Sequence, residues 1–210
     1  MLRRMSALQV IHADDSLLVL DKPEGLLSVP GRGAAGQENL SAWVQANFAD
    51  ARVVHRLDQA TSGLMLFARG AVMQRALSMA FEARQVHKQY VAVVEGCVEG
   101  DAGSIEAPLS ADWPNRPRQV VDAAAGKPAL THWRVLLRHA DSTRLLLEPV
   151  TGRSHQLRVH LQSLGHPIRG DTLYAAPPLR STRLLLHASQ LRLQHPLSGE
   201  PCSFDSPPPF

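Results

Sequence analysis

The chain has 210 residues, of which 44% are hydrophobic, and this is enough for one well-buried domain or for two small lobes that share a core. It contains no apolar run of about 18 residues, and its first residues lack the apolar core of a secretory signal, so we expect a soluble cytoplasmic protein. The formal net charge of +3 and the isoelectric point near 9.2 are only weak indications of a polyanionic partner.

The first half of the chain predicts short strands and amphipathic helices. Residues 10–21 read as two strands around an Asp-Asp turn, and a loop rich in Gly and Pro follows at 23–36. Further predicted elements are a helix with Leu40, Trp43, Val44 and Phe48 on one face, a buried strand in the apolar run 64–68, a helix at 73–81 and a strand at 88–96.

The second half begins with a polar stretch at 101–127 in which Pro and Gly recur. We interpret it as a linker or hinge, or as an exposed loop of a single domain. Paired strands are expected at 130–137 and 144–150, and then a helix whose apolar face is Leu157, Leu161 and Leu164 and which ends at Gly165. A strand at 184–196 precedes a proline-rich tail that we expect to pack loosely.

The irregular order of these strands and helices favours an α+β fold over a doubly wound parallel sheet. Arginine far outnumbers lysine and recurs in turn-like stretches, where its planar fork suits phosphates and base edges. Polar residues also gather where loops meet predicted strands, and such loops often carry sites. These residues lie in three segments, 55–58, 88–90 and 151–160.

Each segment has an ordinary structural interpretation. Asp58 precedes a Thr-Ser-Gly turn and could cap the backbone amide of Thr61 or Ser62. Tyr90 could be a core aromatic residue with a bonded hydroxyl. Arg153 could be a solvated arginine, although a cation near a helix start opposes the helix dipole and therefore favours an anionic partner.

Several chemistries are disfavoured by the sequence. The chain has ten histidines, but His155 and His160 are five residues apart, and no HExxH, CxxC or cluster of carboxylates accompanies them, so we expect no metal. Cys97 and Cys202 are isolated, which argues against a disulfide framework. The stretch around Ser62 lacks the GxSxG frame of a hydrolase, and neither a Walker loop nor GxGxxG occurs, so we expect no nucleotide cofactor.

Four blocks in this order, HRLDQATSGLMLFAR, KQY, TGRSHQLRVHLQSLGHPIRGD and RLLLHASQL, resemble the signature blocks of the RluA family of pseudouridine synthases. DKPEGLLSVPG resembles the first block of that family, and the resemblance covers residues 14–196. It implies an α+β fold with a curved, largely antiparallel central sheet, flanking helices and an RNA-binding cleft. It also implies one catalytic domain over residues 1–210, without an N-terminal S4 domain, and a reaction that needs neither cofactor nor metal.

The resemblance also implies roles for individual residues. Asp58 would be the essential aspartate, Tyr90 the active-site tyrosine, and Arg153 the arginine that pairs with the aspartate. Arg56 would enter the space left by a flipped base, and Leu186 would pack near the uracil. We further expect four residues to bind substrate, namely His55, Lys88, Arg158 and Arg183.

The stretch DWPNRPRQ followed by GKPALTHW resembles the subfamily that modifies both tRNA and 23S rRNA. This resemblance points to uridine 32 of tRNA anticodon loops and uridine 746 of 23S rRNA, and to a monomer without an obligatory protein partner. Two alternatives stay open, a non-catalytic RNA-binding module with the same fold and the same enzyme acting on a different RNA. It is also open whether Asp58 attacks C6 of uracil or C1′ of ribose.

Overall fold

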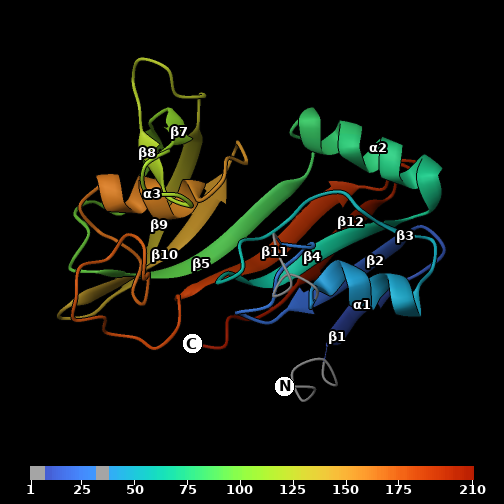
Figure 1. The fold of residues 1–210 in the computed structure, drawn as a ribbon, viewed down its shortest axis with the longest axis horizontal. Helices are drawn as coiled ribbons and strands as arrows, with labels where there is room; N and C mark the ends of the chain where they lie inside the picture. The colour runs from blue at the N-terminus through green and yellow to red at the C-terminus, as the bar shows by residue number, and fades with distance from the viewer. Residues whose placement is uncertain (1–7, 32–37) are drawn as a thin grey trace. The chain divides into compact units, whose positions relative to one another are not determined.

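The computed structural model describes residues 8–31 and 38–210, which form two compact units (Figure 1). The first unit consists of Met1–Lys88 and His187–Pro209, and the second of Gln89–Leu186 with Phe210. The chain leaves the first unit within strand β5 (His87–Glu95) and returns to it at the start of strand β11 (Leu186–Gln194). The first unit is therefore discontinuous in sequence. The single catalytic domain stays a prediction.

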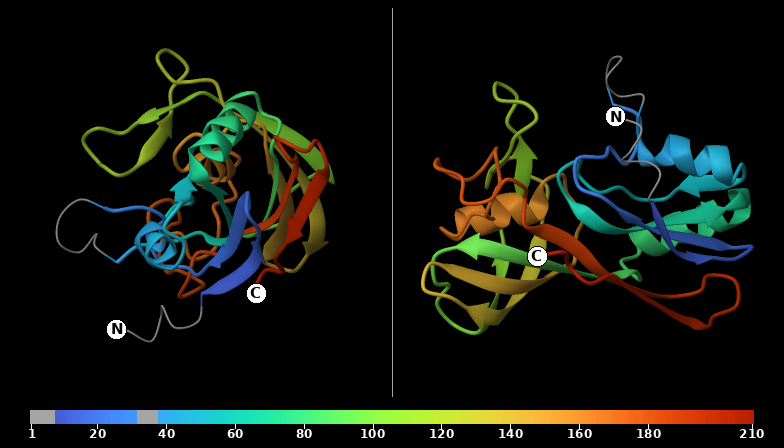
Figure 2. Two further views of the ribbon diagram at one scale, coloured as in Figure 1. Left: turned by 90° about the vertical axis from the view of Figure 1, so that its right-hand side faces the viewer. Right: turned by 90° about the horizontal axis from the view of Figure 1, so that it is seen from below.

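The first unit contains a mixed sheet in which β4 (Ser62–Arg69) pairs with several neighbours. β1 (Gln9–Ala13) and β2 (Leu17–Lys22) form an antiparallel hairpin, and β2 is antiparallel to β4. β3 (Ala51–Val53) pairs antiparallel with the end of β4, and β11 pairs parallel with its start. β12 (Pro201–Asp205) extends this sheet as the antiparallel neighbour of β11, as Figure 2 shows in red.

Helices α1 (Leu40–Asn47) and α2 (Gly70–Glu82) contribute to two separate core clusters of this sheet. Leu64 and Leu66 pack with residues of α2, whereas Met65 and Phe67 pack with residues of α1. Successive side chains of a strand point to opposite faces, so β4 is covered on both faces. A strand buried on both faces reads as a continuous apolar run, which explains the run at 64–68.

The second unit contains an antiparallel sheet in the order β5-β10-β9-β6. Its other strands are β6 (Ala102–Glu106), β9 (Leu130–Arg138) and β10 (Ser142–Pro149). A separate hairpin is made by β7 (Leu109–Ala111) and β8 (Gln119–Val121), and its loop extends away from the rest of this unit (Figure 2). Helix α3 (Gln156–Ser163) contributes Val159 to a cluster with Leu109 of that hairpin. None of the helices in the described ranges is both long and apolar enough to cross a membrane.

The α+β class and the elements predicted in the first 96 residues are confirmed, except that residues 32–36 of the predicted loop lie outside the described residues. Three predictions are wrong. Residues 101–127 are not a linker, because they contain β6, β7 and β8, whose short strands are separated by the Pro and Gly residues. The tail does not pack loosely either, because β12 places Phe204 in the core. At the end of α3, Leu164 follows the last helical residue and is 38% exposed, so it is not part of the buried face.

Candidate active site

Asp58 lies in the segment that connects β3 to β4. Its backbone carbonyl accepts the amide N–H of Thr61 at 3.1 Å, so the turn after Asp58 is closed by a backbone hydrogen bond. The side chain of Asp58 is half-buried, that of Leu57 is buried and that of Arg56 is exposed. The segment therefore holds an anchored leucine between an exposed arginine and a partly accessible carboxylate.

The residues on both sides of Asp58 are fixed by the loop that follows β2. The hydroxyl of Ser28 donates to the carbonyl of Leu57 at 2.7 Å and accepts the Leu57 amide at 3.1 Å. On the other side, the carbonyl of Gln59 accepts the amide of Gly25 at 2.8 Å and Nζ of Lys22 at 3.2 Å. Hydrogen bonds to buried backbone groups are costly to lose, so this arrangement gives Asp58 a defined position.

Lys22 and Ser28 are site residues that the sequence analysis missed. Lys22 is fully buried, and its ammonium also donates to the carbonyls of Pro23 and Leu26, at 2.9 and 2.8 Å. A buried lysine needs such partners, because an unpaired charge in the interior is strongly unfavourable. The sequence feature that could have indicated Lys22 is its position at the end of the mainly apolar strand LLVLDK, just before a loop with several turn residues.

The start of β4, just after the turn, is anchored by a second set of contacts. Ser62 Oγ lies 2.9 Å from Nδ1 of His187, whose Nε2 lies 3.1 Å from Oγ of Ser206. At Gly63, a Cβ would lie 2.3 Å from the carbonyl oxygen of Ala188, and the backbone φ is +113°. Only glycine fits this close approach of the parallel strands β4 and β11.

His55 belongs to the interior of the first unit. Its Nε2 accepts the amide N–H of Leu66 at 2.8 Å, and its ring stacks on Phe81 with centroids 4.8 Å apart. Burial, together with the nearby Lys88, lowers the pKa of His55 to about 3, so the imidazole is neutral. The predicted substrate-binding role of His55 stays a prediction. The pKa of Lys88 is also lowered, first by burial and then by Arg84, and its binding role stays a prediction.

In the second unit, Tyr90 lies on β5, where its Cα pairs with that of Leu147 on β10. Its side chain is half-buried, like those of Lys88 and Gln89 before it, whereas Val91 and Ala92 after it are buried. This exposure agrees better with a site tyrosine than with an ordinary core residue.

Arg153 is exposed in the loop between β10 and α3, and that loop is organised by Gln156. Oε1 of Gln156 accepts the Arg153 amide at 3.0 Å and the Thr151 hydroxyl at 2.7 Å. The guanidinium Nε of Arg153 donates to the carbonyl of Pro128 at 3.1 Å. The expected ion pair between Arg153 and Asp58 joins residues of different units and stays a prediction.

Arg158 is buried against Asp171. Its guanidinium makes two hydrogen bonds of 2.7 Å to the carboxylate of Asp171, and the two side chains are 5% and 0% exposed. It also lies 5.0 Å from the ring centroid of Tyr174. A buried bidentate pair leaves little of the fork for a phosphate, which favours a structural role, and the expected role of Arg158 in substrate binding stays a prediction.

Leu186 is the first residue of β11 and is only 3% exposed. The guanidinium of Arg183 lies 5.5 Å from the ring centroid of Phe210. The roles expected for both residues in substrate binding stay predictions.

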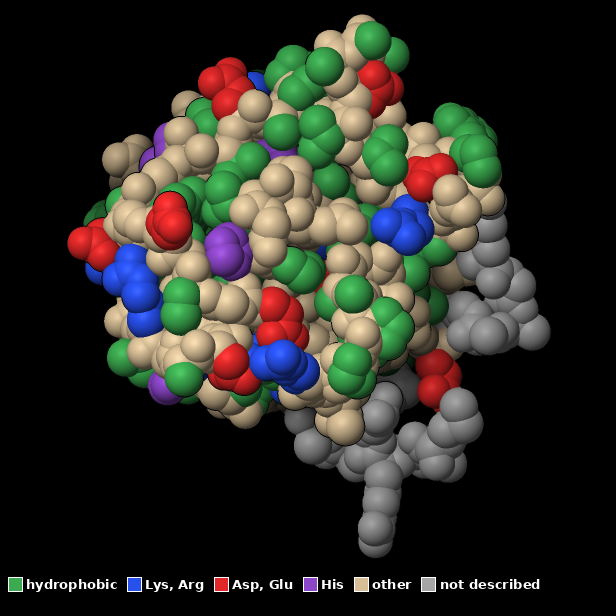
Figure 3. All heavy atoms as spheres, turned by 90° about the vertical axis from the view of Figure 1, so that its left-hand side faces the viewer, with side chains coloured by type: hydrophobic (Ala, Val, Ile, Leu, Met, Phe, Trp, Pro, Cys, Tyr) green, Lys and Arg blue, Asp and Glu red, His purple; other side chains and the backbone are tan. Residues whose placement is uncertain are grey.

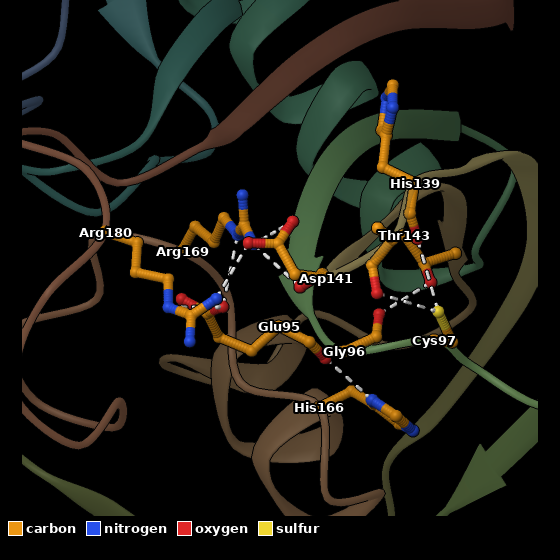
Figure 4. A network of polar contacts seen from close by, with 10 residues as sticks. Glu95, Gly96, Cys97, His139, Asp141, Thr143, His166, Arg169 and Arg180 are labelled. Atoms are coloured by element: carbon orange, nitrogen blue, oxygen red, sulfur yellow. Dashed lines mark hydrogen bonds and ion pairs between the residues drawn. The ribbon is translucent and has the colours of Figure 1, made fainter.

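Two further arginines of the second unit pair with acids. Figure 4 shows Arg169 and Arg180 pointing toward Glu95 and Asp141, with an N–O distance of 2.9 Å from Arg169 to Asp141 and of 2.8 Å from Arg180 to Asp141. A hydrogen bond from Arg169 holds the pKa of Asp141 below its usual value. On the face drawn in Figure 3, the larger groups of Lys and Arg side chains also lie beside Asp and Glu. Some of the arginines that exceed the lysines in number are therefore paired with acidic side chains.

Across residues 8–31 and 38–210, no three His, Cys, Asp or Glu side chains are grouped so that they could hold a metal ion.

Comparisons with known proteins place these observations in a family. The family model described as RNA pseudouridylate synthase matches residues 16–163. The chain is 47% identical to the dual-specificity RNA pseudouridine synthase RluA of Pasteurella multocida and 46% identical to that of Escherichia coli K12. Each match covers 97% of this chain and 94% of the relative. The solved structure of human RNA pseudouridylate synthase domain containing 1 is similar with a TM-score of 0.83 and 27% identity, over 98% of this chain and 85% of that one.

Proposed function

This chain belongs to the family of RNA pseudouridylate synthases, and we propose that it isomerises specific uridines in RNA loops with Asp58 as the catalytic carboxylate. In this reaction the bond from N1 of uracil to C1′ of ribose breaks, and a bond from C5 to C1′ forms. The proton lost from C5 is balanced by one gained at N1. No atom is added and no electron is transferred, so the reaction requires no redox partner.

The observation that carries the assignment of Asp58 is the fixation of its neighbours. Leu57 is held by Ser28, and Gln59 is held by Gly25 and Lys22. A nucleophilic carboxylate is effective when it is ionised and held in one geometry. We propose that Asp58 forms a covalent adduct with the substrate, at C6 of uracil or at C1′ of ribose. The uracil stays in the site while it turns.

The other site residues would act around this carboxylate. Tyr90 would stack against uracil, and its hydroxyl would help to move the C5 proton. Arg153 would favour the ionised form of Asp58 through its planar fork. A uracil must leave its stack to reach any such pocket, at a cost of a few kcal/mol. The exposed Arg56 would offset part of this cost by filling the vacated space.

We propose the same substrates as the sequence suggested, uridine 32 of tRNA and uridine 746 of 23S rRNA. Support comes from the bacterial relatives of 46–47% identity, whose names describe a dual-specificity RNA pseudouridine synthase. Loop nucleotides are the cheapest to flip, which agrees with an anticodon-loop target. We further propose that the protein acts in the cytoplasm as a monomer without an obligatory protein partner.

The test compares Asp58→Asn and Asp58→Ala with the wild type in two measurements. Tritium release from RNA labelled at uracil C5 reports turnover, and filter binding of the same RNA reports affinity. We expect turnover to vanish and affinity to change little. The matched control is Asp15→Asn, which neutralises an exposed aspartate in the turn after β1 and should leave both unchanged.

Retained turnover in either Asp58 variant would contradict the assignment. If the wild type binds RNA tightly but releases no tritium from any RNA, the protein is instead a non-catalytic binding module. Pseudouridine mapping in cells with and without the protein would then identify or exclude the two proposed uridines.

A further inference from the structure

The loop between β7 and β8 carries an exposed aromatic side chain. Trp113 is 68% exposed, whereas the other tryptophans, Trp43 and Trp133, pack within the protein. An exposed indole offers a flat ring on which an unpaired base can stack. The tip of this hairpin therefore presents an aromatic surface to solvent.

The loop that carries Trp113 is closed by several internal hydrogen bonds. The amide of Asp112 donates to the carbonyl of Arg118 at 3.0 Å, and the amide of Arg118 donates to the carbonyl of Asn115 at 3.1 Å. The side-chain amide of Asn115 donates to both carboxylate oxygens of Asp112, at 3.1 and 3.0 Å. A loop of this kind presents its side chains in a fixed arrangement, which lowers the entropic cost of binding.

The base of the hairpin is fixed as well. The hydroxyl of the buried Tyr174 accepts the amide of Gln119 at 2.7 Å and lies 2.8 Å from Nδ1 of His155. The hairpin is thus hydrogen-bonded, through one phenol, to the residue that precedes α3. Trp113 is consequently displayed from an anchored element.

Two arginines of this hairpin differ from the paired arginines of the same unit. The guanidinium of Arg116 lies 3.3 Å from the ring centroid of Trp113, and that of Arg118 lies 5.3 Å from the ring centroid of Tyr174. Neither guanidinium makes an ion pair within the part of the chain that the structure describes, and Nε of Arg118 is buried without a hydrogen-bond acceptor there. The carboxylate of Asp112 in the same loop accepts its hydrogen bonds from Asn115, a neutral amide. The hairpin therefore offers an aromatic ring beside two guanidinium groups that form no ion pair in the described residues.

We propose that the tip of the β7–β8 hairpin is a second RNA contact, in which an unpaired base stacks on Trp113 while Arg116 and Arg118 bind the adjacent phosphates. Single-stranded RNA is held by this combination of aromatic platforms and arginines. This inference rests on the proposed function, because the ligand is the RNA on which the enzyme acts. It adds a contact that is separate from the residues around Asp58.

The first test uses tryptophan fluorescence and a short oligouridylate as the probe. Stacking should quench the wild-type signal, and the quenching should persist in Trp43→Phe, which removes a different tryptophan. Trp113→Ala should weaken binding about tenfold, as expected for the loss of one stacked base, whereas Trp113→Phe should keep most of the affinity. Unchanged affinity in Trp113→Ala would overturn the proposal and would leave the exposed tryptophan as a contact for a protein partner.

The second test addresses the arginines. Arg116→Gln and Arg118→Gln should each reduce the slope of log affinity against log salt by about one, because each removes a phosphate contact. A slope that stays at its wild-type value in both variants would refute the role in phosphate binding. Arg138→Gln is the matched control, since that arginine already pairs with Asp101 at 2.9 Å.

Turnover separates this inference from the proposed function. With a full-length RNA substrate, Trp113→Ala should raise KM and leave kcat unchanged. If the wild type forms pseudouridine and Trp113→Ala has an unchanged KM, only the hairpin site is wrong. If oligouridylate quenches Trp113 but no RNA is isomerised, the hairpin site is right and the proposed function is wrong.

Discussion

Ser28→Ala tests whether the contacts around Asp58 matter for catalysis as well as for folding. Ser28 is 2% exposed, and its hydroxyl makes both a donor and an acceptor bond with the backbone of Leu57. Each bond contributes about 1 kcal/mol, and leaving the buried Leu57 groups unpaired adds about 1–3 kcal/mol. We therefore expect the free energy of unfolding to fall by about 2–4 kcal/mol.

The catalytic effect follows from the adjacency of Leu57 and Asp58. A shift of a reacting group by about 1 Å can cost up to 100-fold in rate, so we expect kcat to fall at least about tenfold. Urea unfolding gives the stability, and tritium release at a temperature where the variant stays folded gives kcat. The control is Ser41→Ala, which removes a buried hydroxyl that bonds Asn39 at 2.7 Å in the same unit. It should cost about 1 kcal/mol and leave kcat unchanged.

Two results would refute this reasoning. If Ser28→Ala is less stable but keeps the wild-type kcat, the contact supports folding and does not position Asp58. If neither quantity changes, the Ser28 hydroxyl does not hold Leu57 in solution.

Three further predictions concern stability and can be measured by denaturant unfolding. Gly63→Ala should lower the free energy of unfolding by about 2–5 kcal/mol. Alanine would be strained at the φ of Gly63, and its Cβ would lie 2.3 Å from the carbonyl oxygen of Ala188. Gly152→Ala is the control and should be nearly neutral, because nothing lies within 4 Å of the position that its Cβ would take. Arg158→Met should cost about 3–5 kcal/mol because it strands the buried carboxylate of Asp171, and a loss of RNA affinity without a loss of stability would instead support a binding role for Arg158. His55 has a pKa of about 3 when folded and 6.5 when unfolded, so the unfolded state takes up a proton first as the pH falls. Its contribution to stability should be present above about pH 6.5 and decline toward pH 3, by at most about 1.4 kcal/mol per pH unit, and His55→Asn should flatten this slope.

Local patterns were enough to predict most of the first unit. The run at 64–68 is apolar at every position because α1 and α2 contribute to cores on both faces of β4. The strand β12 was missed because prolines and polar residues surround it. Within β12, Phe204 is the buried core residue. The segment forms a strand because it pairs with β11, and this pairing is a tertiary contact.

The sequence predicted the role of a site residue only where that role follows from the residues next to it in the chain. The motif around Asp58 indicated the carboxylate, but not that Ser28 holds its neighbour, since these contacts join residues that are 29 positions apart. The block that contains Arg158 likewise gave no sign that this residue is buried against Asp171, because an arginine in a basic block looks accessible until its packing is known. Burial and partner choice are properties of the packed chain, and a single sequence does not display them.

The discontinuous first unit also has a consequence for the nascent chain on the ribosome. The partner of Ser62, His187, and the strands β11 and β12 are translated only after the whole of residues 89–186. Domains generally fold as units during synthesis, and contacts between distant segments must wait for the later segment. We therefore expect the contiguous second unit to fold first, and the turn after Asp58 to be locked only when the last strands have emerged. An arrested chain that ends before His187 would carry every residue of the proposed catalytic set and still lack part of the framework that holds Asp58.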